Sequence, residues 1–170
     1  MNNNYEKISH TFEAVFDDKS EILILGSIPS VKSREYGFFY MHKQNRFWKV
    51  LSKVFDDDFL VDDIEKKKAL LLKHKIALYD VIEACEIIGS SDVSIKNVDP
   101  ANKVIDEIIK KGNIKVIGLN GNKAGDLFKK YFSYLDIKTI YLPSTSPANA
   151  KMDVDSLVNI WENLKKFSLV

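Results

Sequence analysis

Short runs of apolar residues alternate along the chain with longer segments in which apolar positions recur every three or four residues. Each run is too short for a helix and is typical of a strand buried on both faces; the runs cover 22–25, 76–82, 114–119 and 137–142. The periodic segments predict helices with one buried face, at 4–16, 47–54, 62–73, 100–111, 123–131 and 153–167. This alternation predicts an α/β fold, a three-layer α/β/α sandwich around a four-stranded parallel sheet.

Individual residues mark where several of these elements begin and end. Asn45 is suited to cap the helix that follows it. Asp99 and Pro100 are expected to open the helix before the third strand, as its N-cap and first residue, and Gly112 to close it. The segment 85–97 is expected to be a loop, because its glycine and serine residues interrupt the pattern.

The composition is that of an ordinary globular protein. The 170 residues, 45% of them hydrophobic and 29% charged, fit one domain spanning 1–170. The single cysteine, Cys85, excludes an internal disulfide and favours a reducing, cytoplasmic location. No apolar run is long enough to span a membrane and the N-terminus lacks the pattern of a signal peptide, so no membrane partner is expected.

A long loop after the first strand is the strongest candidate for a functional site. Gly26 allows a sharp turn, Pro29 prevents simple continuation of the strand, and no apolar period returns until Asn45. Loops of this length in a small domain are usually functional. Ligands of open α/β sheets bind beyond the carboxyl ends of the strands, where this loop begins. We therefore expect the site to lie at this edge of the sheet.

Charge is unevenly distributed although the net charge is only +1. Between residues 30 and 50 the chain is basic, whereas residues 56–65 are acidic. A local cationic patch can hold phosphates without raising the overall charge. A solvated lysine-rich surface is an equally consistent interpretation of the charge pattern alone.

Several common catalytic motifs are missing. The sequence contains neither a GxGxxG dinucleotide fingerprint after the first strand nor a GxxxxGK[ST] phosphate loop, and it has no GxSxG elbow. Cysteine and histidine are too sparse for a zinc site of the usual spacing. The loops at the predicted site instead combine amides, hydroxyls and aromatic rings, which suit a planar heterocycle held by stacking and hydrogen bonds.

Five segments together resemble the uracil-DNA glycosylase superfamily, and most of all its hypoxanthine-DNA glycosylase branch. They are GSIP at 26–29, GFFYMHKQNRFW at 37–48, LYDV at 78–81, NG at 120–121 and LPSTSPAN at 142–149. The resemblance covers nearly the whole chain. It implies a monofunctional enzyme that hydrolyses the N-glycosidic bond of a deaminated base in DNA, with no cofactor and no metal. A monomer is the default expectation for an enzyme that must scan DNA.

The sequence departs from the superfamily at one informative position. Ile28 stands where most members carry an asparagine or aspartate that positions the attacking water, and an isoleucine side chain cannot orient water. In the hypoxanthine branch the working amide is the asparagine of the HxxN segment, so the resemblance implies that Asn45 is catalytic. Ser30 and Lys43 also differ, since that branch often has glycine and proline there.

The resemblance implies further roles around Asn45. Tyr40 would stack on a base flipped out of the helix, while backbone N–H groups after Gly26 would hydrogen-bond that base. The residues predicted to bind the base are Gly26, Ser27, Ile28, Tyr40, Asp80 and Asn120. Those predicted to bind DNA are Lys32, Arg34, His42, Lys43, Arg46, Ser144, Thr145, Ser146 and Asn149.

Two other functions remain open. A uracil or mismatch-specific glycosylase would use the same pocket, although Ile28 argues against it. A non-catalytic nucleotide-binding module is also consistent with the fold. From the residues alone, Asn45 as a plain helix cap and Tyr40 as a core aromatic are further alternatives, and His10 is expected to be structural.

Overall fold

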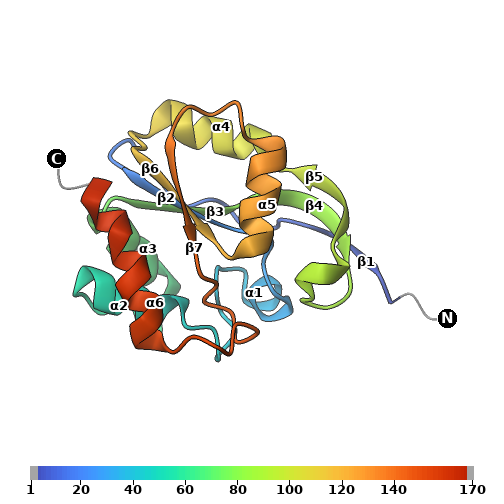
Figure 1. Cartoon of the computed structure of the whole chain (residues 1–170), viewed down its shortest axis with the longest axis horizontal. Coiled ribbons are helices and arrows are strands. Elements are labelled where there is room, and N and C mark those ends of the chain that lie inside the picture. The colour runs from blue at the N-terminus through green and yellow to red at the C-terminus, as the bar shows by residue number, and fades with distance from the viewer. Residues whose placement is uncertain (1–3, 168–170) are drawn as a thin grey trace.

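The computed structural model describes residues 4–167, which adopt an α/β fold (Figure 1). The strands are β1 (Glu6–Ser9), β2 (Ile22–Gly26), β3 (Ile76–Asp80), β4 (Ile82–Ile87), β5 (Lys96–Pro100), β6 (Val116–Asn120) and β7 (Lys138–Leu142). The α-helices are α1 (Val31–Tyr36), α2 (Phe47–Phe55), α3 (Ile64–Lys73), α4 (Asn102–Lys111), α5 (Asn122–Tyr131) and α6 (Val154–Trp161). Short 3₁₀ turns cover Asp92–Ser94 and Glu162–Phe167.

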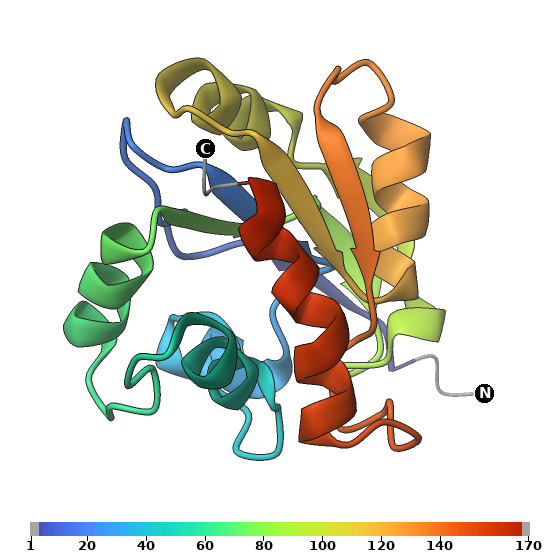
Figure 2. The same cartoon turned by 60° about the vertical axis from the view of Figure 1, so that its left-hand side comes forward.

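The four apolar runs form the predicted parallel sheet, in the order β3-β2-β6-β7. Every residue of β2, β3 and β6 is buried, which explains why these strands are apolar without alternation. Helices α2, α3 and α6 lie together on one side of this sheet and α4 and α5 on the other (Figure 2). The predicted three-layer fold is therefore confirmed.

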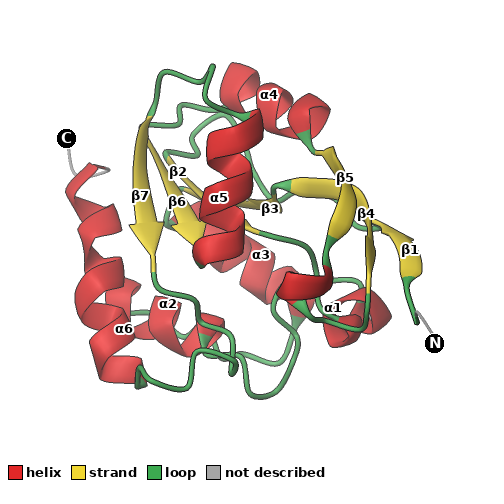
Figure 3. Cartoon of the chain, turned by 45° about the vertical axis from the view of Figure 1, so that its right-hand side comes forward, coloured by secondary structure: helices red, strands yellow, loops and turns green. Residues whose placement is uncertain are grey.

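A second sheet, which the sequence pattern did not predict, joins β1, β4 and β5 in antiparallel pairs (Figure 3). The predicted helix at 4–16 is wrong, because β1 pairs with β4 and Val15 bridges to Leu78 in the parallel sheet. The predicted loop at 85–97 is also wrong, since it contains the end of β4 and the start of β5. Pairing with distant strands overrides the local helical period here.

Smaller corrections concern the ends of elements. Asp99 and Pro100 end β5 instead of opening a helix, and α4 begins after Ala101. Gly112 closes α4 as predicted. The long loop after β2 contains the short helix α1. The last predicted helix ends at Trp161 and continues as a 3₁₀ turn.

Strand register brings the candidate residues to one edge. Gly26 at the end of β2 pairs with Asp80 at the end of β3. Strand β6, which pairs with the other edge of β2, ends at Asn120. The loop after β7 begins at Pro143 on the same edge. Within residues 4–167 no helix is both long and apolar enough to cross a membrane.

Candidate active site

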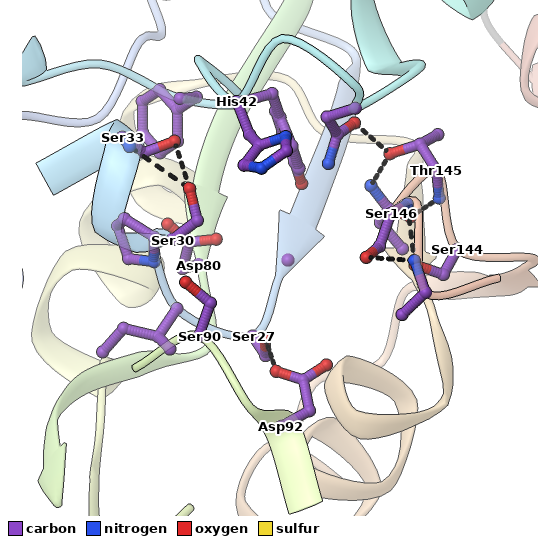
Figure 4. Close-up of a pocket in the computed structure, with 18 of the residues that line it drawn as sticks. Ser27, Ser30, Ser33, His42, Asp80, Ser90, Asp92, Ser144, Thr145 and Ser146 are labelled. Carbon is purple, nitrogen blue, oxygen red and sulfur yellow. Dashed lines mark hydrogen bonds between the residues drawn. The ribbon is translucent and has the colours of Figure 1, made fainter. Parts of the chain in front are cut away.

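A cavity of about 330 Å³ opens at the carboxyl ends of the parallel strands (Figure 4). Its size lies at the lower end of the roughly 300–1,000 Å³ usual for small-molecule sites. Eleven of the residues predicted from the sequence line it: Gly26, Ser27, Ile28, Tyr40, His42, Asn45, Asp80, Asn120, Ser144, Thr145 and Ser146. The remaining walls come from Pro29, Ser30, Ser33, Phe39, Ile87, Ser90, Asp92, Pro147 and Ala148.

Gly26 lies where two polar side chains approach the backbone closely. A Cβ atom at this position would stand 2.6 Å from Oδ1 of Asp80 and 2.7 Å from the hydroxyl oxygen of Tyr40. Both distances are shorter than van der Waals contact, so a side chain here would displace one of them. The absence of a side chain therefore lets a carboxylate and a phenol approach the same point of the backbone.

Tyr40 is held rigidly, with its hydroxyl group unpaired. Its ring stacks on Phe47 with centroids 3.9 Å apart, and its backbone oxygen accepts a hydrogen bond from Trp48 Nε1. The hydroxyl is buried and has no hydrogen-bond partner among the described residues. Burial, together with the nearby negative charge of Asp80, raises the pKa of Tyr40. The phenol therefore keeps its proton.

Asn45 presents one half of its amide to the cavity. Its Oδ1 accepts hydrogen bonds from the backbone N–H of Phe47, 2.9 Å away, and from the hydroxyl of Thr145, 2.8 Å away. The N-cap position of α2 is Arg46, whose side chain does not cap the helix. Asn45, one residue before the N-cap position, supplies the capping side chain instead. Nδ2 makes no hydrogen bond with the described residues, so the amide offers a donor to a ligand.

Asn120 fixes Thr145 through both halves of its amide. Its Oδ1 accepts from the backbone N–H of Thr145 and its Nδ2 donates to Thr145 Oγ1, both at 3.1 Å. The hydroxyl of Thr145 therefore accepts from Asn120 and donates to Asn45. This chain of hydrogen bonds connects the end of β6 to the amide that faces the cavity. It also determines which way the Asn45 amide points.

Arg46 holds the loop after β7 through hydrogen bonds to the loop's carbonyl oxygens. Its guanidinium donates to the carbonyl oxygens of Ser146 at 2.8 Å, Asn149 at 2.9 Å and Thr145 at 3.3 Å, and also to that of Met152. Thr145 itself is completely buried. Both side chains are thus engaged within the protein, in contrast to the phosphate contacts expected from the sequence.

Other hydroxyl and imidazole groups at the cavity retain a hydrogen to donate. The hydroxyl oxygens of Ser144 and Ser146 accept the backbone N–H groups of Ser146 and Ala148, which orients them and leaves their own protons free for a ligand. His42 Nδ1 accepts from the backbone N–H of Gln44. In a neutral ring the His42 proton is then on Nε2.

The remaining predicted phosphate-binding residues lie outside the cavity. Lys32 pairs with Glu35 at 3.2 Å on an exposed turn, and Arg34 donates to the carbonyl oxygens of Pro29 and Gly89. Asn149 donates to the Ser144 carbonyl within its own loop. Lys43 is exposed and lines a neighbouring hollow of about 230 Å³ that also includes His42 and Asn45. None of the ion pairs found within residues 4–167 involves Lys43.

Two polar contacts at the site were not predicted. The side chain of His10 is completely buried, and its Nε2 lies 2.7 Å from Oδ2 of Asp80. Asp92, which also lines the cavity, accepts a hydrogen bond from Ser27 Oγ at 3.0 Å (Figure 4). His10 follows β1 of the second sheet, so no local pattern could place it here. Among residues 4–167 no group of three or more histidine, cysteine or acidic side chains is arranged to hold a metal ion.

Comparison with known proteins gives concordant matches. The family model for the uracil DNA glycosylase superfamily matches residues 13–165. The chain is 32% identical over 142 residues to a protein from Methanosarcina barkeri named hypoxanthine DNA glycosylase, covering 82% of this chain and 87% of that one. A protein of the same name from Methanosarcina acetivorans is 34% identical over 146 residues, covering 85% and 90%.

One solved structure extends the match to three dimensions. It is the solution NMR structure of a Methanosarcina acetivorans protein described as a uracil DNA glycosylase, which superposes with a TM-score of 0.73 at 29% identity. The superposition covers 91% of this chain and 96% of that chain.

Proposed function

This chain belongs to the uracil DNA glycosylase superfamily, and we propose that it removes hypoxanthine, the base of deoxyinosine, from DNA. Two relatives at 32% and 34% identity carry the name hypoxanthine DNA glycosylase, and their matches cover more than four fifths of the chain. The observation that carries the proposal is the amide of Asn45, whose carbonyl is fully engaged while its Nδ2 faces the cavity. Ile28 also lines the cavity, and its side chain has no polar group with which to orient water.

The proposed reaction breaks the bond between N9 of the purine and C1′ of the deoxyribose. The base leaves with the bonding electron pair, water adds its oxygen to C1′, and one proton of that water ends on the released base. Negative charge therefore builds on the base in the transition state. Nδ2 of Asn45 donates a hydrogen bond to the departing base, and a preorganised donor of this kind stabilises developing charge more than ground-state charge.

Base extrusion precedes the chemistry. Enzymes that act on a base flip its nucleotide out of the stack, at a cost of about a few kcal/mol that is smallest for poorly paired bases. We assign the backbone contacts that stabilise the flipped state to Lys43, His42 and the hydroxyls of Ser144 and Ser146, which retain donors for phosphate. Arg46 and Thr145 we assign to holding the loop after β7 instead.

The partner in this proposal is DNA that contains a deaminated base, bound by a monomer. The single cysteine, which is buried, fits a reducing compartment such as the cytoplasm. Direct attack by water requires neither a lysine Schiff base nor a cofactor.

A gel assay tests this function. Duplex oligonucleotides that carry hypoxanthine, xanthine, uracil or a G:T mismatch are incubated with the protein, and abasic sites are then cleaved with alkali. We expect cleavage at hypoxanthine to be fastest. Cleavage at uracil without cleavage at hypoxanthine would favour a uracil glycosylase, and retarded DNA that is never cleaved would favour a binding module.

The hydrogen-bond chain through Thr145 makes a separate prediction. Thr145→Val keeps the shape of the side chain but removes the hydroxyl that orients Asn45, so we expect the single-turnover rate of excision to fall about 10-fold to 100-fold, since each lost buried hydrogen bond costs about 1–3 kcal/mol. Thr145→Ser restores the hydroxyl and is expected to recover most of the rate. Equal rates for the valine and serine variants would show that the hydroxyl does not position the amide.

A further inference from the structure

The proposed reaction needs a group that accepts a proton from the attacking water, and three side chains on the cavity wall are candidates. They are the carboxylates of Asp80 and Asp92 and the imidazole of His42. The Tyr40 hydroxyl is excluded, because burial raises its pKa and it keeps its proton. Hydrogen bonding decides between the three, since a base needs an unoccupied lone pair within reach of the water.

Two of these groups are already engaged. Nδ1 of His42 accepts from the backbone N–H of Gln44, so in a neutral ring Nε2 carries the proton and neither nitrogen is left to accept one. Oδ2 of Asp80 lies 2.7 Å from Nε2 of the buried His10, and the Asp80 side chain is only 4% exposed. Asp80 therefore lies on the buried wall of the cavity with one of its oxygens occupied.

Asp92 differs from Asp80 in both respects. Its Oδ1 accepts from the Ser27 hydroxyl at 3.0 Å, while its Oδ2 makes no hydrogen bond with the described residues. Asp92 is exposed although it lines the cavity, so solvent water reaches the carboxylate. Figure 4 shows Asp92 beside Ser27 and well apart from Thr145, the residue that orients Asn45. The Asn45 amide and the free carboxylate oxygen thus come from different parts of the wall.

The loop between β4 and β5 holds Asp92 in a defined position. Ser90 Oγ accepts a hydrogen bond from the backbone N–H of Val31, which ties the loop to the start of α1. Ser94 Oγ donates to the carbonyl oxygen of Ser91, so the 3₁₀ turn that begins at Asp92 is closed on itself. A catalytic group is most effective when the fold has already placed it, and these contacts place the carboxylate before DNA binds.

We propose that Asp92 is the catalytic base that takes a proton from the attacking water, with Ser27 as its positioning residue. This inference rests on the proposed function. As the water oxygen bonds to C1′, one water proton passes to Oδ2 of Asp92, and the bond between C1′ and N9 breaks with its electron pair on the base. The carboxyl group then returns its proton to solvent, from which the released base takes one up. A carboxylate from a distant loop thus supplies what the Ile28 side chain lacks, a polar atom that orients water.

The charged surroundings of Asp92 also suit a base. Desolvation by the protein atoms around the carboxylate raises the pKa of Asp92, against the opposing effects of the Ser27 hydrogen bond and of Lys123 in α5, and the negative charge of Asp80 raises it further. Arg34 of α1, which also contacts this loop, donates to two backbone carbonyl oxygens instead. A carboxylate with a raised pKa holds a proton more strongly and is therefore the better base.

The pH dependence of single-turnover excision tests this assignment, with the enzyme in saturating excess so that DNA affinity does not enter the rate. The wild-type rate on a deoxyinosine duplex should fall as the pH is lowered through the pKa of Asp92, because only the carboxylate accepts a proton. In Asp92→Asn the amide oxygen still accepts from Ser27, but the NH₂ group cannot take a proton. We expect a rate about 100-fold below that of the wild type, since general bases contribute about 10²–10⁴-fold, and no fall at low pH. A fall caused by another group of the cavity, such as Asp80 or His42, would persist in this variant.

Two further variants complete the experiment. Ser27→Ala removes a hydrogen bond that favours the charged carboxylate, so the pKa of Asp92 rises and the fall in rate should begin at a higher pH than in the wild type. A loss of structure alone would not move the profile in this way. Asp99→Asn is the matched control, because it makes the same change of carboxylate to amide on an exposed residue of β5 outside the cavity. Its rate and pH profile should equal those of the wild type.

The outcomes separate this inference from the proposed function. Failure of the wild type to excise hypoxanthine at any pH would overturn the proposed function and this inference with it. Wild-type excision combined with an Asp92→Asn variant that is equally fast, or slower with the same fall at low pH, would overturn the role of Asp92 alone. Should Asp92→Asn fail to fold, Ser27→Ala decides the question, because an unshifted pH profile in that variant would then overturn the assignment.

Discussion

Asn45→Asp is expected to lower the single-turnover rate of hypoxanthine excision by about 10²–10³-fold, the usual loss when one preorganised donor to a developing charge is removed. Oδ1 of the aspartate can still accept from both Phe47 and Thr145, so the start of α2 keeps its cap. The atom that faces the cavity, however, changes from a donor to a negatively charged acceptor. Charge building on the departing base would then be repelled instead of stabilised.

Stability and a neighbouring variant provide the controls for Asn45. The urea midpoint of Asn45→Asp should stay close to that of the wild type, because the helix cap is preserved. Gln44→Glu makes the same amide-to-carboxylate change one residue earlier on an exposed side chain, and its excision rate should be unchanged. Excision by Asn45→Asp at the wild-type rate would remove Asn45 from the chemistry and reduce it to a helix cap.

Arg46→Met is expected to cost about 2–4 kcal/mol of unfolding free energy, because hydrogen bonds from charged groups contribute about 1.5–3 kcal/mol and several carbonyls lose their donor together. Those carbonyls belong to the loop after β7 that carries Thr145. Loosening this loop also frees the amide of Asn45, so excision should slow even where the variant remains folded. Urea denaturation followed by tryptophan fluorescence measures the change.

Lys43→Met is the matched stability control for Arg46. Both side chains are basic and lie close together in the sequence, but Lys43 is exposed and makes no ion pair among the described residues. Exposed substitutions of this kind usually change stability by less than about 0.5 kcal/mol. If Arg46→Met changed the unfolding free energy as little as Lys43→Met, the loop after β7 would be held by other contacts.

The parallel sheet could be predicted because its strands are buried on both faces. Ile22–Leu25 and its neighbours are apolar without interruption, a pattern that depends only on the layers around them. The carboxyl ends of such strands share one edge, which is why the sequence alone was enough to group Gly26, Asp80 and Asn120. Eleven of the predicted site residues line one cavity for that reason.

The second sheet and the roles of several side chains could not be predicted. The apolar positions of residues 4–16 fit a helical period, but β1 is stabilised by pairing with β4, nearly eighty residues away. His10 reaches Asp80 only through that pairing. Arg46 has the charge expected of a phosphate ligand, yet its guanidinium binds carbonyl oxygens that only the folded loop brings within reach. Long-range contacts of this kind leave no local signal.

The central claim is that the side-chain amide of Asn45, in the loop between β2 and α2, donates a hydrogen bond that promotes hydrolytic release of hypoxanthine from DNA. Product analysis tests it most directly: the wild-type protein is incubated with a duplex containing deoxyinosine, and free base and abasic sites are quantified together. The account predicts one free hypoxanthine for each abasic site, and release that is about 10²–10³-fold slower from Asn45→Asp. Duplex that binds but releases no base, or equal release by the two proteins, would contradict it.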